Sequence, residues 1–473
     1  MRITKIEIKN YRGFPSDIDF NLGTEGKNLI LYGENGSGKS SLYHALRNFF
    51  SLLPPNIKEQ KNIFKEDDEP SIKLSIGDTK NPSVIYEWSE QASPKDQAII
   101  QGTAKTKGFI DYKDILETSY VHRFDKQVNL FNLLIRHILA NVNNPITKVE
   151  LGEEWAQILV SLNGRQTANI VEKRNQMITG FNDGVLETLK NLQQRANDVL
   201  SYFDPNIKIN LVFKPVPVPL PKSTRASTYQ IYEEIILEIE YFGIKVNSPH
   251  IFLNEARLTA IGLSLYLSSF LQYPKSSLQL LVLDDALIGL DLSNRIPLLE
   301  VLEKLFTDWQ ILLLTYDKVW FEIVRSQKPD WCWQELYIND SLIPVIKNNC
   351  DYLKIAKDHL NNHDEHAAAV YIRAEFERKL KKYCEKQHVR VQYKEPPQKT
   401  DTGEMLDELE KVLKADPKWT SDATWQAQYP KMFLSVRTAR KVVLNPLSHS
   451  ELVTLAKAEI QQAIDAIENF MLL

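Results

Sequence analysis

The sequence has 473 residues, of which 43% are hydrophobic and 25% are charged, and its formal net charge is −4. This composition is typical of a folded globular protein, so it excludes intrinsic disorder, and the length predicts about two or three domains. The weak negative charge argues against wholesale coating of nucleic acid, although a local basic patch stays possible.

Cysteine usage and hydrophobic patterning indicate the cellular compartment and whether the chain enters a membrane. Only three cysteines occur, none of them paired at metal-ligand spacing, which excludes a disulfide scaffold or a zinc ribbon and predicts a reducing, cytoplasmic compartment. The N-terminus has no apolar signal core, and no stretch reaches the roughly 18 apolar residues that span a bilayer. We therefore expect no membrane association.

The N-terminal part begins with strands and one helix. Residues 2–9 alternate between apolar and charged, and residues 28–32 form a short apolar run that ends at a glycine, so both are expected to be strands. Residues 40–50 carry apolar side chains at helical spacing. Two further strands are expected at 71–76 and 83–88. Together these elements indicate an α/β fold.

The middle of the chain is expected to form helices first and strands after them. Residues from about 125 to 205 are helix-like and almost free of proline, which predicts a helical arm. A packed bundle and a short projecting coiled arm both stay possible, because no sustained heptad is visible. Strands are expected at 207–213 and within 231–246.

Two wholly apolar runs, 279–283 and 310–314, are typical of strands buried on both faces. The helical span at 298–306 lies between them, which predicts a parallel βαβ unit. Beyond about residue 344 the pattern predicts helices only.

A phosphate-binding motif stands between the apolar run at 28–32 and the helix at 40–50. The stretch GENGSGKS at 33–40 fits the pattern G-x-x-x-x-G-K-[ST] in the required strand-to-helix context. In such a loop the backbone N–H groups turn toward phosphate, Lys39 reaches the outer phosphates, and Ser40 offers its hydroxyl to Mg²⁺. We expect ATP with Mg²⁺, contacted here by Gly33, Asn35, Gly36, Gly38, Lys39, Ser40 and Ser41.

The second half of such a site should be a buried strand that ends in acids. The stretch LLVLDD at 280–285 supplies one. We expect Asp284 to hold Mg²⁺ through water and Asp285 to act as the general base that orients the attacking water, with Lys39 as its catalytic partner. Taken alone, two acids after a strand would indicate a solvated turn, but together with the phosphate loop they predict an ATPase site.

Several segments, in this order, resemble the ABC-type ATPases of the SMC/RecF class over residues 1 to about 327: ITKIEIKNYRGF, GENGSGKSS, LNEARLTAIGLSLYLS, LLVLDDALIGLD and LLLTYD. The resemblance implies that the segment from Leu253 is the signature, which reaches the γ-phosphate of a second subunit's nucleotide, with Asn254 at its helix N-terminus. It also implies that Arg12 points at phosphate and that Tyr316 takes the place of a γ-phosphate sensor.

Several positions depart from the usual pattern of that class, and Glu255 and Ala256 stand in place of the two glycines of the signature. Asn254 replaces the signature serine, Asp285 replaces the glutamate base, and Tyr316 replaces a histidine. These departures suit slow, switch-like hydrolysis. The glutamine of the Q-loop has no clear counterpart, and its best candidate region is 108–116.

The resemblance sets the expected organisation as an α/β ABC-type P-loop ATPase head with an inserted helical arm and a C-terminal all-α domain. The expected parts are an N-terminal lobe of the head at 1–124, the arm at 125–205, a C-terminal lobe at 206–343 and the helical domain at 344–473.

The compact head, short arm and extra helices are similar to the ATPase subunits of PARIS-type and Septu-type anti-phage defence systems. That resemblance implies a homodimer or larger oligomer of heads, serving as sensor or scaffold for a separate nuclease effector and responding to a phage protein. The alternative is a RecF-like clamp that grips DNA in repair or replication, so DNA binding stays open.

The C-terminal region holds two weaker signals. Arg440 and His449 resemble the pair used by small helical RNases, but their spacing is too long. His359, His363 and His366 share a helix at turn-like spacing, which would suit a metal, although solvated histidines are the favoured interpretation.

Overall fold

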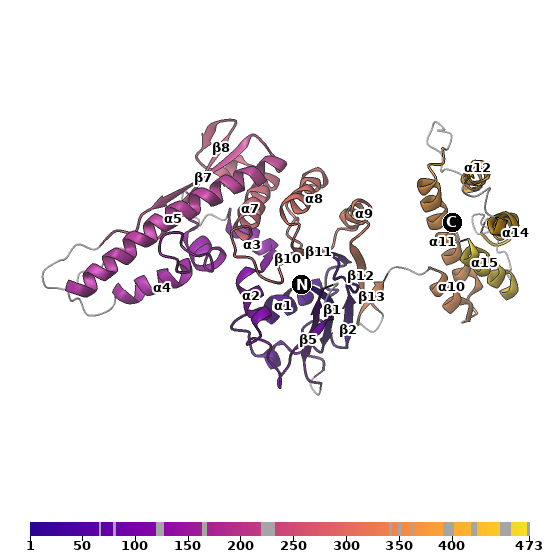
Figure 1. Cartoon of the computed structure of the whole chain (residues 1–473), viewed down its shortest axis with the longest axis horizontal. Coiled ribbons are helices and arrows are strands. Elements are labelled where there is room, and N and C mark those ends of the chain that lie inside the picture. The colour runs from indigo at the N-terminus through magenta and orange to yellow at the C-terminus, as the bar shows by residue number, and fades with distance from the viewer. Residues whose placement is uncertain are drawn as a thin grey trace. The chain divides into compact units, whose positions relative to one another are not determined.

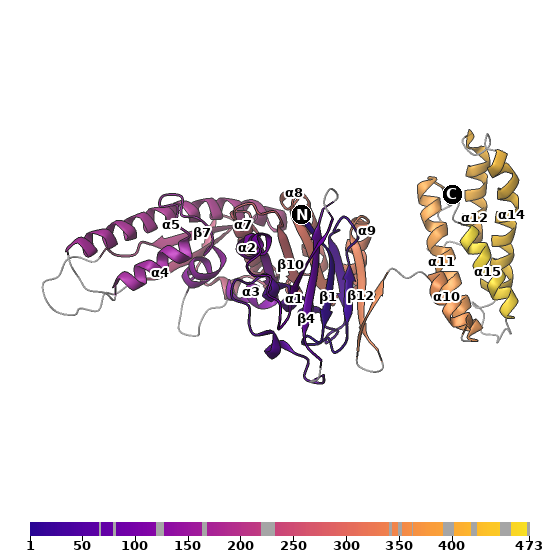
Figure 2. The same ribbon diagram turned by 60° about the horizontal axis from the view of Figure 1, so that its bottom comes forward.

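The computed structural model divides into two compact units, Met1–Asn348 and Asn349–Leu473, called here the first and the second unit. Figures 1 and 2 show both. The structure describes residues 1–65, 68–78, 82–119, 127–162, 168–218, 232–339, 343–348, 352–361, 363–390, 402–417, 423–444 and 456–470. Within these ranges, no helix combines the length and the apolar character that crossing a bilayer requires.

A six-stranded sheet forms the centre of the first unit. Its strands follow the order β13 (Pro344–Asn348), β12 (Cys332–Ile338), β3 (Leu29–Gly33), β11 (Gln310–Thr315), β10 (Leu280–Asp284) and β6 (Gly108–Asp111). All neighbours are parallel except β12 and β13. The parallel pairing of β10 with β11 confirms the βαβ unit expected there, whose helix is α8 (Leu292–Leu305).

The central strands are buried on both faces, which explains their unbroken apolar sequence. On β10, Leu281 and Leu283 pack into one core with α5, α7, α8 and α9. Leu280 and Val282, on the opposite face, pack into a second core with α1 and an antiparallel sheet. Figure 1 shows α7, α8 and α9 on one side of this sheet and α1 on the other.

The antiparallel sheet has the order β2-β1-β4-β5. Strands β1, β2 and β4 largely alternate buried and more exposed residues, as the sequence pattern of residues 2–9 predicts for β1. The bounds are β1 (Arg2–Lys9), β2 (Ile18–Asn21), β4 (Ser71–Gly77) and β5 (Val84–Trp88).

The helices of the first unit connect or cover these sheets. Their bounds are α1 (Lys39–Phe49), η1 (Ile57–Gln60), α2 (Ala98–Thr106), α3 (Tyr112–Glu117), η2 (Asn132–Ile138), α4 (Leu151–Leu162), α5 (Ala168–Phe203), α6 (Pro249–Phe252), α7 (Glu255–Phe270) and α9 (Lys318–Gln327).

Helix α5 lies within the helical arm that the sequence predicts, and it has 36 residues. It packs against α4, α7, α8 and the strand β7, and Trp155 of α4 stacks on Phe181 of α5 with ring centroids 5.3 Å apart. A third sheet, β7-β8-β9, follows it, with bounds β7 (Ile207–Lys214), β8 (Glu234–Tyr241) and β9 (Ile244–Val246). The described residues of this region therefore pack largely into the first unit's core.

The second unit is built from helices around their own apolar core. Their bounds are α10 (Tyr352–Asn361), α11 (Glu365–Lys386), α12 (Thr402–Ala415), α14 (Ala423–Ala439), η3 (Arg440–Leu444) and α15 (Lys457–Asn469).

The expectation of helices only from residue 344 is wrong for the first residues of that range. Pro344–Asn348 forms β13 and pairs with β12, so these residues belong to the first unit's sheet. The segment is too short for a strand signal in the sequence to outweigh the helical pattern that follows it.

Candidate nucleotide-binding site

The phosphate loop runs from β3 into the N-terminus of α1. Gly38 is the residue before the helix and has φ 108°, a conformation that side chains disfavour. A Cβ at this position would lie only 2.6 Å from the Phe14 ring. The Ser37 hydroxyl is buried in the loop without a hydrogen-bond partner, which leaves a polar atom suited to a ligand oxygen.

Lys39 is buried within the loop, with 4% of its surface exposed. Its Nζ donates hydrogen bonds to the carbonyl oxygens of Gly33, at 2.8 Å, and Glu34, at 3.2 Å. The same Nζ lies 3.7 Å from Oδ2 of Asp285. The ammonium group therefore lies between the loop and the acids that follow β10.

Asp284 ends β10 and is 5% exposed. Burial raises the pKa of Asp284 to about 6, while a hydrogen bond with the Ser40 side chain opposes that rise. Its Oδ1 is buried without a partner. A buried carboxylate beside a serine hydroxyl provides the hard oxygen ligands that Mg²⁺ prefers, so these two residues could hold the ion.

Asp285 turns the chain away from the sheet, with φ 49°. Its backbone N–H donates to the Leu314 carbonyl at 3.0 Å, and its Oδ1 accepts a hydrogen bond from the Tyr316 N–H at 3.0 Å. Burial raises the pKa of Asp285 above its usual value, opposed by the charge of Lys39. The side chain is thus fixed at the edge where β3, β11 and β10 end.

The NYRGF segment lies against the start of α1. The Gly13 N–H donates to the Ser41 hydroxyl at 3.1 Å, which ties this segment to the helix. Arg12 has φ 47°, and its Nε donates to Oε1 of Gln60 at 2.9 Å. Tyr316 is 40% exposed, and its backbone N–H contacts Asp285.

The signature segment opens α7. Asn254 is the N-cap, and its Oδ1 accepts a hydrogen bond from the Arg257 N–H at 3.1 Å. Arg257 in turn contacts Asp204 at 3.1 Å and the Tyr241 hydroxyl at 2.8 Å. Among the described residues, no hydrogen bond or ion pair joins 253–257 to the loop at 33–40 of the same chain.

The turn after the two acids touches α7. A Cβ on Gly289 would lie 2.2 Å from the Thr259 hydroxyl, so this approach requires glycine. Arg295 is 8% exposed, and it donates to the Leu290 carbonyl at 2.8 Å and pairs with Asp317 at 2.6 Å. Sequence reasoning did not single out Arg295, because a charged residue inside a helix usually faces solvent.

The candidate Q-loop region forms β6 and α3. Its strand ends at Asp111, which pairs in parallel register with Asp284 of β10. Sequence reasoning named the region without choosing a residue. The available signal was an acid directly after the short apolar run GFI, and that pattern is too common to be decisive.

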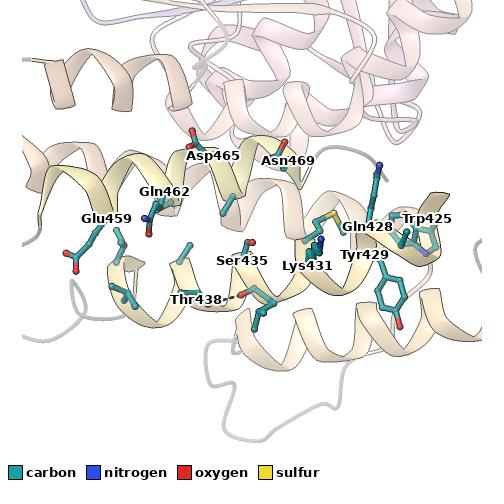
Figure 3. Close-up of a pocket in the computed structure, with 18 residues that line it drawn as sticks. Trp425, Gln428, Tyr429, Lys431, Ser435, Thr438, Glu459, Gln462, Asp465 and Asn469 are labelled. Carbon is teal, nitrogen blue, oxygen red and sulfur yellow. Dashed lines mark hydrogen bonds between the residues drawn. The ribbon is translucent and has the colours of Figure 1, made fainter. Parts of the chain in front are cut away.

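The second unit contains a groove of about 1030 Å³ between α14 and α15. Figure 3 shows Tyr429, Ser435 and Thr438 on one helix and Gln462 and Asp465 on the other. All of its lining residues belong to the second unit. It therefore does not include the phosphate loop.

One of the three histidines at turn-like spacing in the second unit stacks on an aromatic ring. The His359 ring stacks on Tyr371 with centroids 5.3 Å apart, and its Nδ1 lies 3.3 Å from Asp364. Across the described part of the chain, no group of three or more His, Cys, Asp or Glu could hold a metal ion. His449 of the RNase-like pattern lies outside the described residues.

The AAA ATPase domain model matches residues 1–255, which is more than half of the chain. The chain belongs to the AAA ATPase domain family. This AAA ATPase also has the predicted fold class, with a parallel sheet that carries a phosphate loop, an inserted helical region and further helices at the C-terminal end.

Among curated proteins, the AAA ATPase is 30% identical over 164 residues to the Septu protein PtuA of Bacillus mycoides strain KBAB4. The match covers 30% of this chain and 22% of that relative. The expected resemblance to a Septu-type ATPase is confirmed by this match, although the chain spans less than a quarter of the relative's length.

Solved structures similar to the chain include an Smc head domain bound to the C-terminal domain of ScpA, derived from Pyrococcus furiosus. Its sequence identity is 12% and its TM-score is 0.46, and the match covers 76% of this chain and 99% of that one. Another is the recombination mediator protein RecF with ATP, with 14% identity, a TM-score of 0.46 and coverage of 73% and 97%.

Proposed function

We propose that this AAA ATPase binds ATP at the loop 33–40 and hydrolyses it with the acids that end β10. One arrangement carries the proposal: Lys39 Nζ lies 3.7 Å from Asp285, while the Ser40 side chain contacts Asp284. Mg²⁺ held by Ser40 and Asp284 supplies positive charge toward the phosphates. The loop N–H groups bind phosphate oxygens, and Lys39 orients the outer phosphates.

Asp285 is the proposed general base. Its raised pKa favours acceptance of a proton from water, and the Tyr316 N–H holds one of its oxygens in place. The carboxyl is one methylene shorter than the usual glutamate. We therefore propose slow, switch-like turnover.

The phosphate-loop proposal is tested with Lys39→Ala, beside Lys304→Ala as the control. Lys304 pairs with Glu300 on the exposed surface of α8, so it is a lysine of the same unit without a place in the loop. We expect the first variant to lose ATP binding with its thermal midpoint retained and the second to bind as the parent does, measured by titration with a fluorescent ATP analogue. ATP binding by Lys39→Ala near the parent's affinity would contradict the assignment.

We also propose that two chains form each complete site. The supporting observation is that Asn254 opens a helix N-terminus, a position that favours anions, without a polar link to its own phosphate loop. Directly before it, Ile251 and Phe252 are 77% and 63% exposed. A second copy of the chain, presenting its nucleotide, fits both features.

Mixing variants tests the composite site. Asn254→Arg places bulk where the helix N-terminus meets phosphate, so it should disrupt one half of the site, while Lys39→Ala disrupts the other. A mixture of the two inactive variants should recover part of the ATPase activity, and activity per chain should rise with concentration. Activity that stays linear at concentrations where mass measurement detects only monomers, with no rescue on mixing, would leave a single-chain ATPase.

The biological role that we propose is that of sensor or scaffold subunit in an anti-phage defence system, in which ATP state controls a partner nuclease and a phage protein is the trigger. The supporting observation is the 30% identity to the Septu protein PtuA. Purification from the native operon followed by native mass measurement should recover a nuclease with the oligomer. Recovery of the chain alone, together with ATP-dependent and salt-sensitive DNA retention, would instead favour a RecF-like clamp.

A further inference from the structure

Arg295 connects the two turns that follow β10 and β11. The first turn, residues 285–291, leads from β10 to α8, and the Nε of Arg295 donates a hydrogen bond to the Leu290 carbonyl within it at 2.8 Å. The second turn, residues 316–317, leads from β11 to α9, and the Nη1 of Arg295 pairs with Oδ2 of Asp317 at 2.6 Å. Because the guanidinium group is planar and its donors have fixed directions, one side chain sets the spacing of both turns.

The proposed base, Asp285, depends on both turns. It opens the first turn with φ 49°, a left-handed conformation that is uncommon for a residue with a side chain and persists where surrounding contacts impose it. Its Oδ1 accepts a hydrogen bond at 3.0 Å from the N–H of Tyr316, which lies in the second turn. A shift of either turn would therefore move the carboxylate.

The two carboxylate oxygens of Asp317 have different partners. Oδ1 accepts hydrogen bonds from the N–H groups of Val319, at 2.9 Å, and Trp320, at 3.1 Å, and so caps α9. Oδ2 pairs with Arg295 instead. Asparagine or serine would cap the helix as well without a negative charge. The cap alone therefore does not account for an ion pair at this position.

Burial makes this ion pair a poor choice for a merely structural link. Arg295 is only 8% exposed, and the cost of desolvating a buried pair largely offsets its attraction, so apolar side chains of similar volume often stabilise such a contact as well. What the pair adds is a fixed direction. A pocket of about 20 Å³ is lined by Asp285, Tyr316, Asp317 and Arg295, among others. The guanidinium group and the base therefore border the same small space.

We propose that Arg295 is a positioning residue for ATP hydrolysis, which holds the turns 285–291 and 316–317 at the spacing that places the Asp285 carboxylate. This inference rests on the proposed nucleotide site and deepens it. Arg295 acts through the two turns rather than on the nucleotide itself. Its loss should slow hydrolysis with ATP binding retained, whereas the loss of a merely structural link would change stability alone.

The experiment separates nucleotide affinity from turnover. Single-turnover hydrolysis and the Kd of a fluorescent, non-hydrolysable ATP analogue are measured for the parent, Arg295→Met and Arg295→Lys, each well below its thermal midpoint. We expect Arg295→Met to lower the hydrolysis rate about 10- to 100-fold with an unchanged Kd, as for a misplaced catalytic group. Arg295→Lys keeps the charge but not the planar fork, so it should recover part of the rate.

A double variant keeps the test independent of folding. Arg295→Met alone leaves the half-buried carboxylate of Asp317 without its partner, whereas Arg295→Met combined with Asp317→Asn removes both charges and keeps an oxygen to cap α9. The double variant should be as slow as Arg295→Met, with the Kd of the parent. Parental turnover in the double variant would overturn the inference, and so would loss of nucleotide binding together with turnover.

A further comparison tests whether Arg295 acts through the base. Adding Arg295→Met to Asp285→Asn should slow hydrolysis no further, because the group that Arg295 positions is already absent, and losses that multiply would overturn the inference. Arg325→Met is the matched control, since Arg325 pairs with Glu322 on its own helix α9, and it should change neither value. These outcomes concern Arg295 alone, whereas a parent protein that neither binds nor hydrolyses ATP would overturn the proposed function.

Discussion

A buried carboxylate oxygen lacks a hydrogen-bond partner at the nucleotide site, whereas the buried charged groups of the second unit are paired. At the site, Asp284 has a buried oxygen without a partner and a pKa raised to about 6. In the second unit the buried Glu375 pairs with Arg378 at 2.7 Å, and the buried Lys379 donates to the Ile467 carbonyl at 2.7 Å. Within the described residues of that unit, no buried side-chain N or O lacks a hydrogen-bond partner.

This difference separates groups that serve a ligand from groups that serve the fold. Unpaired buried charge costs stability, so it persists where a ligand compensates it. Paired buried charge in the second unit is compatible with a purely structural core. The comparison therefore predicts which substitutions impair chemistry and which impair folding.

The largest expected effect is on hydrolysis. Asp285→Asn keeps an oxygen that can accept the Tyr316 N–H but removes the group that takes a proton from water. We expect turnover to fall about 10²- to 10⁴-fold with nucleotide binding retained, as is usual when a general base is lost. Single-turnover kinetics with radiolabelled ATP measures this, and unchanged turnover would place the base elsewhere.

A core substitution in the second unit should affect folding and spare the chemistry. Phe433 is 1% exposed and packs edge-on against Phe470, with centroids 6.0 Å apart. Phe433→Ala should cost about 3–5 kcal/mol of that unit's stability, while nucleotide binding by the first unit persists.

The matched control is Leu434→Ala on the same helix, since Leu434 is 66% exposed and its loss should change stability by less than about 0.5 kcal/mol. Urea unfolding, followed in parallel by far-UV circular dichroism and by nucleotide binding, distinguishes the units. Equal loss of both signals in Phe433→Ala would show that the two units unfold together.

The smallest of these effects is a gain in stability. The pKa of Asp284 in the folded state, about 6, lies above its ordinary value of 3.8, so the folded protein holds this proton more tightly than the unfolded chain does. This carboxyl therefore destabilises the nucleotide-free protein increasingly as pH rises from about 4 through about 6. The difference corresponds to about 3 kcal/mol at most.

Asp284→Asn should remove that penalty, raising the thermal midpoint of the metal-free and nucleotide-free protein at pH 7.5 and raising it less at pH 4.5, where only about a third of the penalty is present. Asp308→Asn, an exposed acid paired with Lys275, is the control and should change neither value. A lower midpoint for Asp284→Asn at pH 7.5 would show that the carboxylate is stabilising, contrary to the comparison.

The sequence was most informative where the signal is local. The phosphate loop and the acids at 284 and 285 each lie within one short stretch, where spacing and residue type restrict the backbone. The strand at 344–348 was missed because an edge strand of this length leaves little pattern of its own, and its partner β12 decides its conformation.

By itself the sequence determined the strands with a clear apolar pattern, the loop and the identities of the polar groups, because apolar periodicity and glycine placement act over a few residues. Only the tertiary structure decided which strand ends meet. Placing β11 between β3 and β10, and β6 beside β10, brings residues 33–40, 111 and 284–285 to one edge of the sheet. That order depends on two cores packed on opposite faces of the sheet from segments far apart in the chain, and no local pattern encodes it.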